Sequence, residues 1–382
     1  MLKYNTYFSD PQQLQQLKKS PVREVILEHS VLSRFGFWNT ETLLKWADIL
    51  KNEGFELLLQ WDILTTQDGL RECLDVIQQL PLHWFKAIRV KDLGAAQWLL
   101  ENRSEGAMHL LLDTGNHNLF AVKRWQQYFK GPLKRVVLSS ELPGYRLKEY
   151  TDELEIPSEV LGVGKILFFY TPRQLLTPLG FEKLNGNIQM TAQENLTFQR
   201  HFPTIENQHG TFMFHDRDLF LLDQLDEVQA TGIDTLRLDL RFGTPSEWIH
   251  ELAQLNSERG SALKNKWPIK TTHGFFRTNR TDKPIELIKN KYLKLHQGEL
   301  LGQVVEAVKG DYIALMSRKP FDLGDHLLMI TPAGKKIEVT LSSIQTISGK
   351  SVQQAQDSGL WLIPHQKFVT QKSLVYKIIE DL

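Results

Sequence analysis

The ionisable residues between positions 209 and 241 have types and spacing that could do chemistry. A short apolar strand runs into His215, and a second strand, Thr235–Leu240, alternates leucines with Arg237 and Asp239 before Arg241. A period of two puts these three charges on one face of the strand. A histidine near carboxylates can transfer protons, and guanidinium groups suit carboxylate ligands. Such a face either borders solvent or lines a polar pocket, and the spacing fits both.

Polar residues also follow the other predicted strands. They are Glu28, His29 and Arg34; Gln60 and Asp62; Lys91 and Asp92; Asp113 to Asn118; Ser139 to Glu141; Tyr170 to Arg173; His215 to Asp218; and Asp239 to Arg241. Taken singly, each is better explained as a helix cap or a solvated side chain. Taken together, they favour one pocket. We expect the catalytic residues to be Asp62, His215 and Asp239, and the substrate-binding residues to be Glu28, Gln60, Asn118, Arg173, Arg237 and Arg241.

No metal or cofactor is expected from the residues themselves. The histidines at 29, 117, 209 and 215 include no tight pair of the kind that binds zinc. Cys73 is the single cysteine among 382 residues. The chain alone therefore forms no intrachain disulfide and holds no cysteine-ligated cluster. We expect Cys73 to be a buried helix residue rather than a nucleophile.

Strand and helix signals alternate over the first two thirds of the chain. The predicted strands are 23–27, 55–61, 85–90, 109–112, 135–138, 159–169, 210–214 and 235–240, with helix-period segments between them. Eight such units in about 250 residues match a closed TIM-like (β/α)8 barrel, whose functional residues lie where strands end. A doubly wound open sheet is the alternative, but no glycine-rich phosphate motif follows the first strand.

The composition predicts three regions. Residues 1–257 form the barrel domain, in which 177–208 is an insertion that serves as a lid or binding loop or is irregular padding. Residues 258–297 form a basic linker and a helix. Residues 298–382 contain short strands and tight turns, which predict a small C-terminal antiparallel β-barrel domain.

The basic linker is the local feature that suits nucleic acid. Lys plus Arg equals Asp plus Glu at 45 each, so the whole chain has no net charge that attracts RNA or a membrane. Basic and aromatic residues together can bind phosphates and stack bases. The predicted RNA contacts are Lys264, Lys266, Lys270, Arg277 and Arg280. The alternative is a solvated linker whose aromatic residues dock on the barrel. Without a signal peptide's apolar core or a membrane-spanning window, we expect a cytoplasmic protein.

Short motifs in a consistent order resemble those of the bacterial peptidase family U32, the collagenase-like group. They are Lys91–Gly94, Asn118, Arg135–Leu142, Gly210–Leu219, Gly232–Arg237, Gly302–Val305, Phe321–Asp325 and Ile330–Gly334. The resemblance covers nearly the whole chain. It implies a barrel followed by the family's C-terminal β-domain.

The resemblance implies RNA-related chemistry more than proteolysis. Better understood relatives insert oxygen into tRNA, ribosomal RNA or ubiquinone precursors, hold an iron–sulfur cluster on four cysteines, and in some cases depend on prephenate. Leu167 and Arg173 stand where two of those cysteines are found, and 198–201 contains none. We therefore expect cluster chemistry to be absent from this chain.

Three functions remain open. The first is a cluster-less hydrolase or peptidase-like enzyme that uses Asp62 or Asp239 with His215 at the C-terminal rim of the barrel. The second is a non-catalytic member that binds RNA or a protein partner through the basic linker and the small barrel. The third is a binder of a small anionic metabolite through Arg237 and Arg241.

Overall fold

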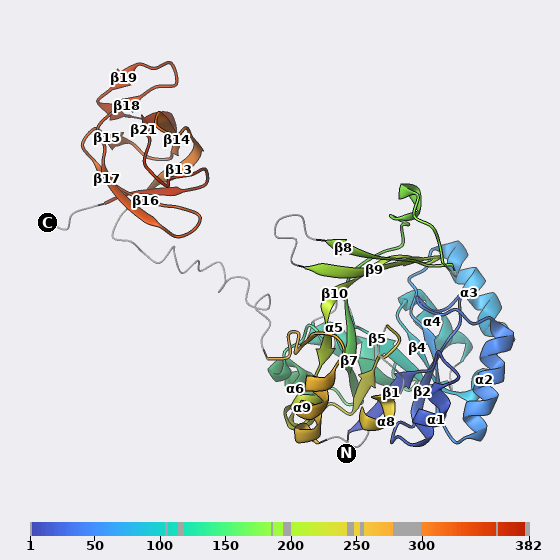
Figure 1. The fold of residues 1–382 in the computed structure, drawn as a ribbon. Coiled ribbons are helices and arrows are strands. Elements are labelled where there is room, and N and C mark those ends of the chain that lie inside the picture. Colours follow the sequence, from blue (N-terminus) through green and yellow to red (C-terminus); the bar gives the residue numbers. More distant parts are fainter. Residues whose placement is uncertain are drawn as a thin grey trace. The chain divides into compact units, whose positions relative to one another are not determined.

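The computed structural model divides the chain into two compact units, Met1–Asn279 and Arg280–Leu382. It describes residues 2–103, 106–113, 118–184, 186–193, 200–242, 248–252, 256–277, 299–356 and 358–378. Figure 1 shows strands surrounded by helices in the larger unit and strands alone in the smaller one. Each unit has its own hydrophobic core, as separate domains do.

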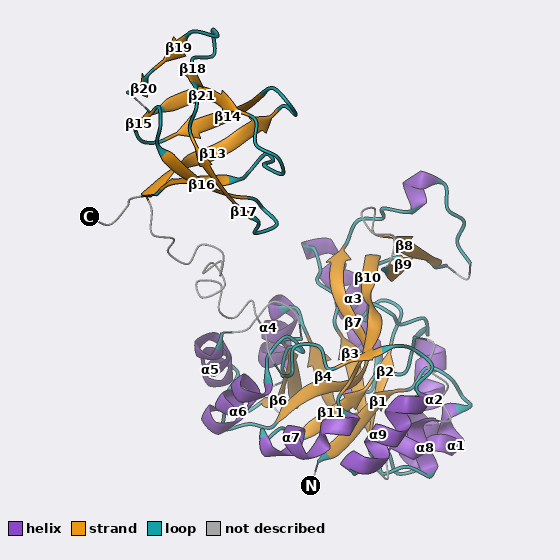
Figure 2. Ribbon diagram, turned by 60° about the vertical axis from the view of Figure 1, so that its left-hand side comes forward, coloured by secondary structure: helices purple, strands orange, loops and turns teal. Residues whose placement is uncertain are grey.

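Eight parallel strands close the barrel of the larger unit. They are β1 (Lys3–Tyr7), β2 (Glu24–Glu28), β3 (Glu56–Trp61), β4 (Phe85–Val90), β5 (Met108–Leu111), β6 (Leu133–Val137), β7 (Ser158–Thr171) and β11 (Thr235–Leu238). Strand β11 pairs in parallel with both β7 and β1, so the ring has no free edge. This closure confirms the predicted TIM-like barrel. Figure 2 shows the strands enclosed by the helices.

Amphipathic helices connect and cover the strands. They are α1 (Gln13–Lys18), α2 (Thr40–Asn52), α3 (Gln67–Gln79), α4 (Leu93–Asn102), α5 (Leu119–Tyr128), α6 (Gly144–Glu153), α7 (Leu225–Ala230), α8 (Trp248–Leu252) and α9 (Ser257–Lys266), with short 3-10 turns η1 (Leu82–Trp84), η2 (Thr177–Leu179) and η3 (Leu222–Gln224). Helix α2 buries Leu43, Ala47 and Leu50, which share one helical face. Side chains at the first turns fix where helices begin: Asn39 accepts from the Thr42 amide, and Asp92 from the Ala95 amide.

The inside of the barrel combines apolar side chains, among them Ile26, Leu58 and Ala87, with a network of buried charges. Glu24 accepts two bonds from Arg135, at 2.6 and 3.0 Å, and Glu159 accepts two from Arg89, at 2.8 and 2.7 Å. Gln60 accepts from Nε of Arg89 at 2.8 Å. All five side chains are buried. Because buried charges are tolerated only with good partners, this network fixes the barrel interior.

The prediction that residues 210–214 form a barrel strand is wrong. The segment Gly210–Phe214 belongs to β10 (Gly210–Phe220), which pairs antiparallel with β7 and lies outside the ring. The eighth barrel strand is instead β1, whose sequence KYNTY lacks an apolar pattern. Asn5 donates to the buried Glu159, whereas Thr6, on the opposite face of the strand, donates to the Leu238 carbonyl of the neighbouring β11. The predicted number of strands is thus right for a partly wrong reason.

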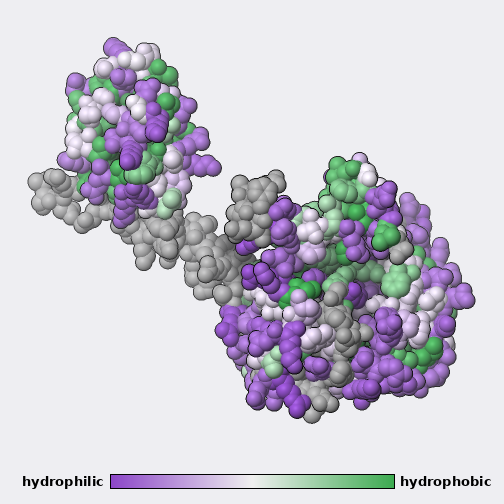
Figure 3. Space-filling view, in the orientation of Figure 1, coloured by the Kyte–Doolittle hydropathy of each residue, from purple (hydrophilic) through white to green (hydrophobic). Residues whose placement is uncertain are grey.

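An antiparallel ribbon extends from β7. Strand β10 pairs with β9 (His201–Asn207), and β9 pairs with β8 (Ile188–Gln193), so the described part of the insertion 177–208 is built mainly of strands. Figure 1 shows the ribbon standing away from the ring of helices. Figure 3 shows hydrophobic side chains on the loop that carries η2, where Leu179 and Leu184 are 70% and 79% exposed.

The described part of the basic linker packs against the barrel. Trp267 donates from Nε1 to Asp218 at 3.0 Å, and β12 (Thr271–Thr272) pairs with β10. These contacts place residues 256–277 in the first unit. The predicted helix at 284–296 lies outside the described residues. Within the described ranges, no helix is long and apolar enough to cross a membrane.

The smaller unit is an antiparallel β-domain, as predicted. Its strands are β13 (Glu299–Ala307), β14 (Tyr312–Ser317), β15 (Phe321–Asp322), β16 (His326–Ile330), β17 (Lys336–Thr340), β18 (Ile344–Gln345), β19 (Ser351–Val352), β20 (Gln354–Ala355), β21 (Gly359–Pro364) and β22 (Leu374–Lys377). One sheet has the order β17-β16-β22-β13-β14-β21-β18-β19, and β15 pairs with β20. Val304, Leu315 and Val375 belong to its buried core.

Candidate functional site

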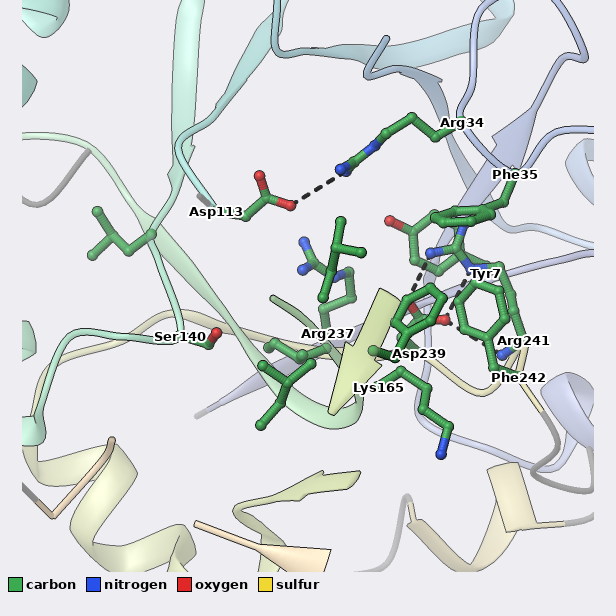
Figure 4. A pocket seen from close by; sticks show the side chains of 15 residues that line it. Tyr7, Arg34, Phe35, Asp113, Ser140, Lys165, Arg237, Asp239, Arg241 and Phe242 are labelled. Atoms are coloured by element: carbon green, nitrogen blue, oxygen red, sulfur yellow. Dashed lines mark hydrogen bonds and ion pairs between the residues drawn. The ribbon is translucent and has the colours of Figure 1, made fainter. Parts of the chain in front are cut away.

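A cavity of about 50 Å³ lies at the carboxyl end of the barrel strands. Its charged lining consists of Arg34, Asp113, Lys165, Arg237, Asp239 and Arg241. Figure 4 shows these residues coming from different strands and loops, with the ammonium group of Lys165 pointing away from Arg237 and Asp113. A single water needs about 10–15 Å³, so there is room for a carboxylate or phosphate group. The lining has four cations and two acids, and three of the cations also pair with carboxylates behind the lining, those of Asp62, Asp218 and Glu28.

Arg241 holds two carboxylates at this rim. It donates to Asp239 at 2.9 and 2.6 Å and to Glu28 at 2.7 Å, and its guanidinium lies 3.4 Å from the Tyr7 ring centre. Burial acts to raise the pKa of Asp239, but the charge of Arg241 brings that pKa below its usual value. Burial keeps the pKa of Glu28 raised in spite of Arg241. Glu28 is therefore the rim carboxyl that retains a proton to higher pH.

Arg34 and Lys91 neutralise the two other rim carboxylates. Asp62 accepts from the Arg34 backbone amide at 2.9 Å and from Nε of Arg34 at 2.8 Å. Asp113 forms ion pairs with Lys91 at 2.7 Å and with Arg34 at 3.5 Å. Burial opposes ionisation of both acids, yet these cations lower the pKa of Asp62 and hold that of Asp113 well below its usual value. Neither carboxylate is free to act as a general base.

Arg237 is the cavity cation with the weakest compensation. Its Nη1 donates to Glu159 at 3.2 Å, but that carboxylate already accepts two shorter bonds from Arg89 and one from Asn5. Nε of Arg237 is buried and has no hydrogen-bond partner among the described residues. An unsatisfied buried donor costs about 1–3 kcal/mol. An acceptor atom in the cavity would reduce that cost.

A second, wider cavity of about 440 Å³ adjoins the first. The two share Phe35, Arg241 and Phe242, and Figure 4 shows both rings beside the Arg241 guanidinium. Its other walls include Gln189 of β8 and Asn207 of β9, so the antiparallel ribbon covers part of the rim. The site therefore has a small charged chamber and a larger chamber lined by rings and amides.

The predicted catalytic residues do not form one group. Asp239 lines the inner cavity, and Asp62 reaches it only through Arg34. His215 is half-buried on β10, pairs with Asp216 at 3.0 Å, and is not part of the cavity lining. The structure thus places the proposed acid–base histidine apart from the two carboxylates.

The predicted substrate-binding residues also divide. Arg237 and Arg241 line the inner cavity, and Glu28 lines the outer one. The other three lie elsewhere: Gln60 bonds Arg89 inside the barrel, Asn118 accepts from the Phe120 and Ala121 amides as the cap of α5, and Arg173 is exposed beyond β7.

The residues predicted to contact RNA differ in exposure. Lys266, Lys270 and Arg277 are exposed, and Arg277 donates to Gln224 at 2.7 Å. Lys264 is partly buried in an ion pair with Asp223 at 2.6 Å. Arg280 lies outside the described residues.

Sequence reasoning missed two polar residues of the cavity, besides several apolar ones such as Phe35 and Phe242. Tyr7 ends the unpredicted strand β1, and burial raises its pKa to about 12, so its hydroxyl stays protonated. Lys165 lies within β7 and pairs with buried Asp218 at 2.8 Å. A lysine inside an otherwise apolar strand was the signal for Lys165, whereas the pattern around Tyr7 offered none.

The fold and rim define a TIM-type barrel protein with a charged strand-end cavity and an appended β-domain. The chain belongs to peptidase family U32, whose model matches residues 30–277. The tRNA hydroxylation protein P of Escherichia coli (strain K12) is 20% identical over 357 residues, covering 77% of this chain and 77% of that protein. The tRNA hydroxylation protein P2 of Bacillus subtilis (strain 168) is 21% identical over 230 residues, covering 58% of this chain and 73% of that protein.

Among solved structures, the C-terminal domain of a U32 peptidase from Geobacillus thermoleovorans is 15% identical to part of this chain, with a TM-score of 0.20, and the match covers 22% of this chain and 93% of that one.

The four-cysteine iron–sulfur cluster implied by the family resemblance does not fit this chain. The chain has one cysteine, Cys73, which is buried in α3. Burial raises the pKa of its thiol to about 11, whereas cluster ligation requires a thiolate. The described residues also contain no group of three or more His, Cys, Asp or Glu side chains arranged for a metal ion.

Proposed function

We propose that the protein binds a small anionic metabolite in the rim cavity, with Arg237 as the main contact. The observation that carries this proposal is the incompletely paired, buried guanidinium of Arg237 in a cavity lined by four cations and two acids. A guanidinium matches the geometry of carboxylate and phosphate oxygens. Arg34, Lys165 and Arg241 already hold acids, so they shape the cavity while Arg237 faces the ligand.

The outer chamber supports a ligand larger than its anionic group. Its volume of about 440 Å³ falls in the range of about 300–1,000 Å³ typical of small-molecule sites. Phe35 and Phe37 supply apolar surface, and Gln189 and Asn207 supply amide hydrogen bonds. These walls suit an uncharged, partly polar body joined to a carboxylate or phosphate.

Thermal unfolding with a panel of small carboxylates and phosphate esters tests the anion site. A ligand at 100 times its Kd should stabilise the wild type by about 2.7 kcal/mol. Arg237→Met should lose that stabilisation and still fold, because Glu159 retains Arg89. Arg217→Met, at an exposed position of β10 outside the cavity, is the matched control and should respond like the wild type. Equal stabilisation of Arg237→Met would refute the proposed contact.

We also propose that this protein contacts RNA. The support is that two relatives are named tRNA hydroxylation proteins, and that Lys266 at the end of α9 and Lys270 and Arg277 after it are exposed. Binding of a tRNA transcript should weaken with salt, and each lost phosphate contact should lower the slope of log K against log salt by about 0.7–0.9. The double variant with Lys266→Ala and Lys270→Ala should lower this salt slope. The control Lys45→Ala, at another exposed position, should leave the slope unchanged.

The geometry gives less support to a hydrolase. A general base needs a free lone pair near the reacting atom. Asp62 and Asp239 instead accept bonds from Arg34 and Arg241, and His215 pairs with Asp216 outside the cavity.

A further inference from the structure

We propose that the C-terminal β-domain binds single-stranded RNA by stacking a base on the ring of Phe368. This inference rests on the proposed RNA contact, but it names a separate site in the second unit. Phe368 follows β21 and is 54% exposed. A large apolar side chain that is this exposed, at a backbone conformation unfavourable for it, suggests a functional role.

The backbone at Phe368 is unusual for a side chain of this size. Its φ is 75°, and among the described non-glycine residues only Phe368 and Lys372 have positive φ. The Val369 amide donates to the Gln366 carbonyl at 3.1 Å, which puts Phe368 at the third position of a turn. That position normally takes glycine or asparagine when φ is positive. Strain of this kind is concentrated at functional positions.

The loop that carries Phe368 is anchored to the core of the domain, so the position of the Phe368 ring is fixed. Val369 is 3% exposed and belongs to the domain's core. A second turn follows, in which buried Ser373 donates from both its amide and its hydroxyl to the Thr370 carbonyl. The Lys372 amide donates to Val304 of β13 at 2.8 Å. A ring held in this way loses little conformational freedom when a base stacks on it.

Lysines surround the ring. Nζ of Lys335, from the β16–β17 hairpin, lies 3.1 Å from the ring centre, and Nζ of Lys367 lies 5.1 Å from it. Lys372 comes from the same loop as Phe368. No described acidic residue forms an ion pair with Lys335, Lys367 or Lys372. The ammonium group of Lys335 lies over one face of the ring, so a base that stacks on that face must displace it, and the displaced charge can then pair with a flanking phosphate.

This combination favours single-stranded nucleic acid over other anionic partners. An acidic peptide would use the lysines but has no need of the ring, and a lipid surface would need several apolar side chains together. An aromatic platform beside cations suits a base with its phosphates. The base must be unpaired, because a duplex hides the face that stacks.

The experiment uses the full chain and a fluorescent single-stranded oligouridylate. Phe368→Gly removes the ring while allowing the positive φ, so the variant should keep or raise its melting temperature. Its affinity should fall about 5- to 150-fold, the effect of losing one aromatic–base stack. Phe368→Tyr should bind like the wild type. Ile347→Ala, a control at a residue 68% exposed on the same domain, should also leave affinity unchanged.

Two further measurements separate stacking from charge. An oligonucleotide without bases should bind the wild type as weakly as oligouridylate binds Phe368→Gly, and the variant should no longer distinguish the two. Lys335→Ala with Lys367→Ala should lower the salt slope by about 1.4, or about 0.7 for each phosphate contact.

Failure of the proposed RNA contact and failure of the Phe368 site give different results. A wild type that binds neither oligouridylate nor tRNA would remove the proposed RNA contact as a whole. RNA binding that is unchanged in Phe368→Gly, or a Phe368-dependent affinity for anionic vesicles or an acidic peptide instead of RNA, would overturn only the site inferred here.

Discussion

Arg34 is the cation on which the rim carboxylate of Asp62 depends. Replacing it with Arg34→Met leaves a buried, charged Asp62 without its partner, so we expect a loss of about 3–5 kcal/mol in the free energy of unfolding. Adding Asp62→Asn should recover most of that loss. Urea denaturation at pH 7 measures both. Without Arg34, burial acts to raise the pKa of Asp62, so the single variant should gain stability relative to the wild type as the pH falls from 7 toward 5.

His109 makes the barrel interior sensitive to acid. Burial, with the charges of Arg135 and Arg89, lowers its pKa to about 3. Since the unfolded chain takes up a proton near pH 6.5 and the folded chain does not, stability should fall by about 1.4 kcal/mol per pH unit from about pH 6.5 toward pH 3. His109→Leu should remove that contribution. Denaturation at pH 7.5 and 5.5 compares the two proteins, and identical pH dependence would refute a neutral buried His109.

One carboxylate, that of Glu206, connects the antiparallel ribbon to the segment that follows β7. Glu206 of β9 accepts from the Leu176 amide at 2.6 Å, the Thr177 amide at 2.8 Å and the Thr211 hydroxyl at 2.6 Å. Although burial opposes ionisation, these bonds lower its pKa to about 2. Glu206→Gln replaces one accepting carboxylate oxygen with an NH2 group, which cannot accept these hydrogen bonds. Hydrogen exchange should therefore accelerate in 171–177 and 201–213, while the barrel strands stay protected. The same segments should open in the wild type as the pH falls from about 4.5 toward 2.

Elements with apolar patterns could be predicted from the sequence, and polar ones could not. The barrel class could be predicted because apolar strands such as 56–61 and 85–90 alternate with helices along the chain. Strand β1 was missed because its sequence is polar and the partners of Asn5 and Thr6 lie 154 and 232 positions away. Segment 210–214 has the right composition for a barrel strand, and only pairing direction shows otherwise. Composition reports burial, whereas register and direction depend on distant partners.

The same limit applies to the site. Position at strand ends correctly brought Arg237, Asp239 and Arg241 to one cavity. It could not show that Arg241 also reaches Glu28, 213 residues away, or that Asn118 is occupied as a helix cap. Charge pairing decides whether a polar residue is free for a ligand, and pairing is a property of the folded chain.

At the scale of the whole molecule, the two units should unfold separately because their cores share no residue. Leu315→Ala, at a fully buried position of the β-domain core, should destabilise that unit by about 2–5 kcal/mol. In calorimetry, one transition should move to lower temperature while the other, which an anionic ligand raises, stays in place. Leu59→Ala, equally buried in the barrel unit, should have the reverse effect. A single transition that both substitutions shift would show that the two units unfold as one.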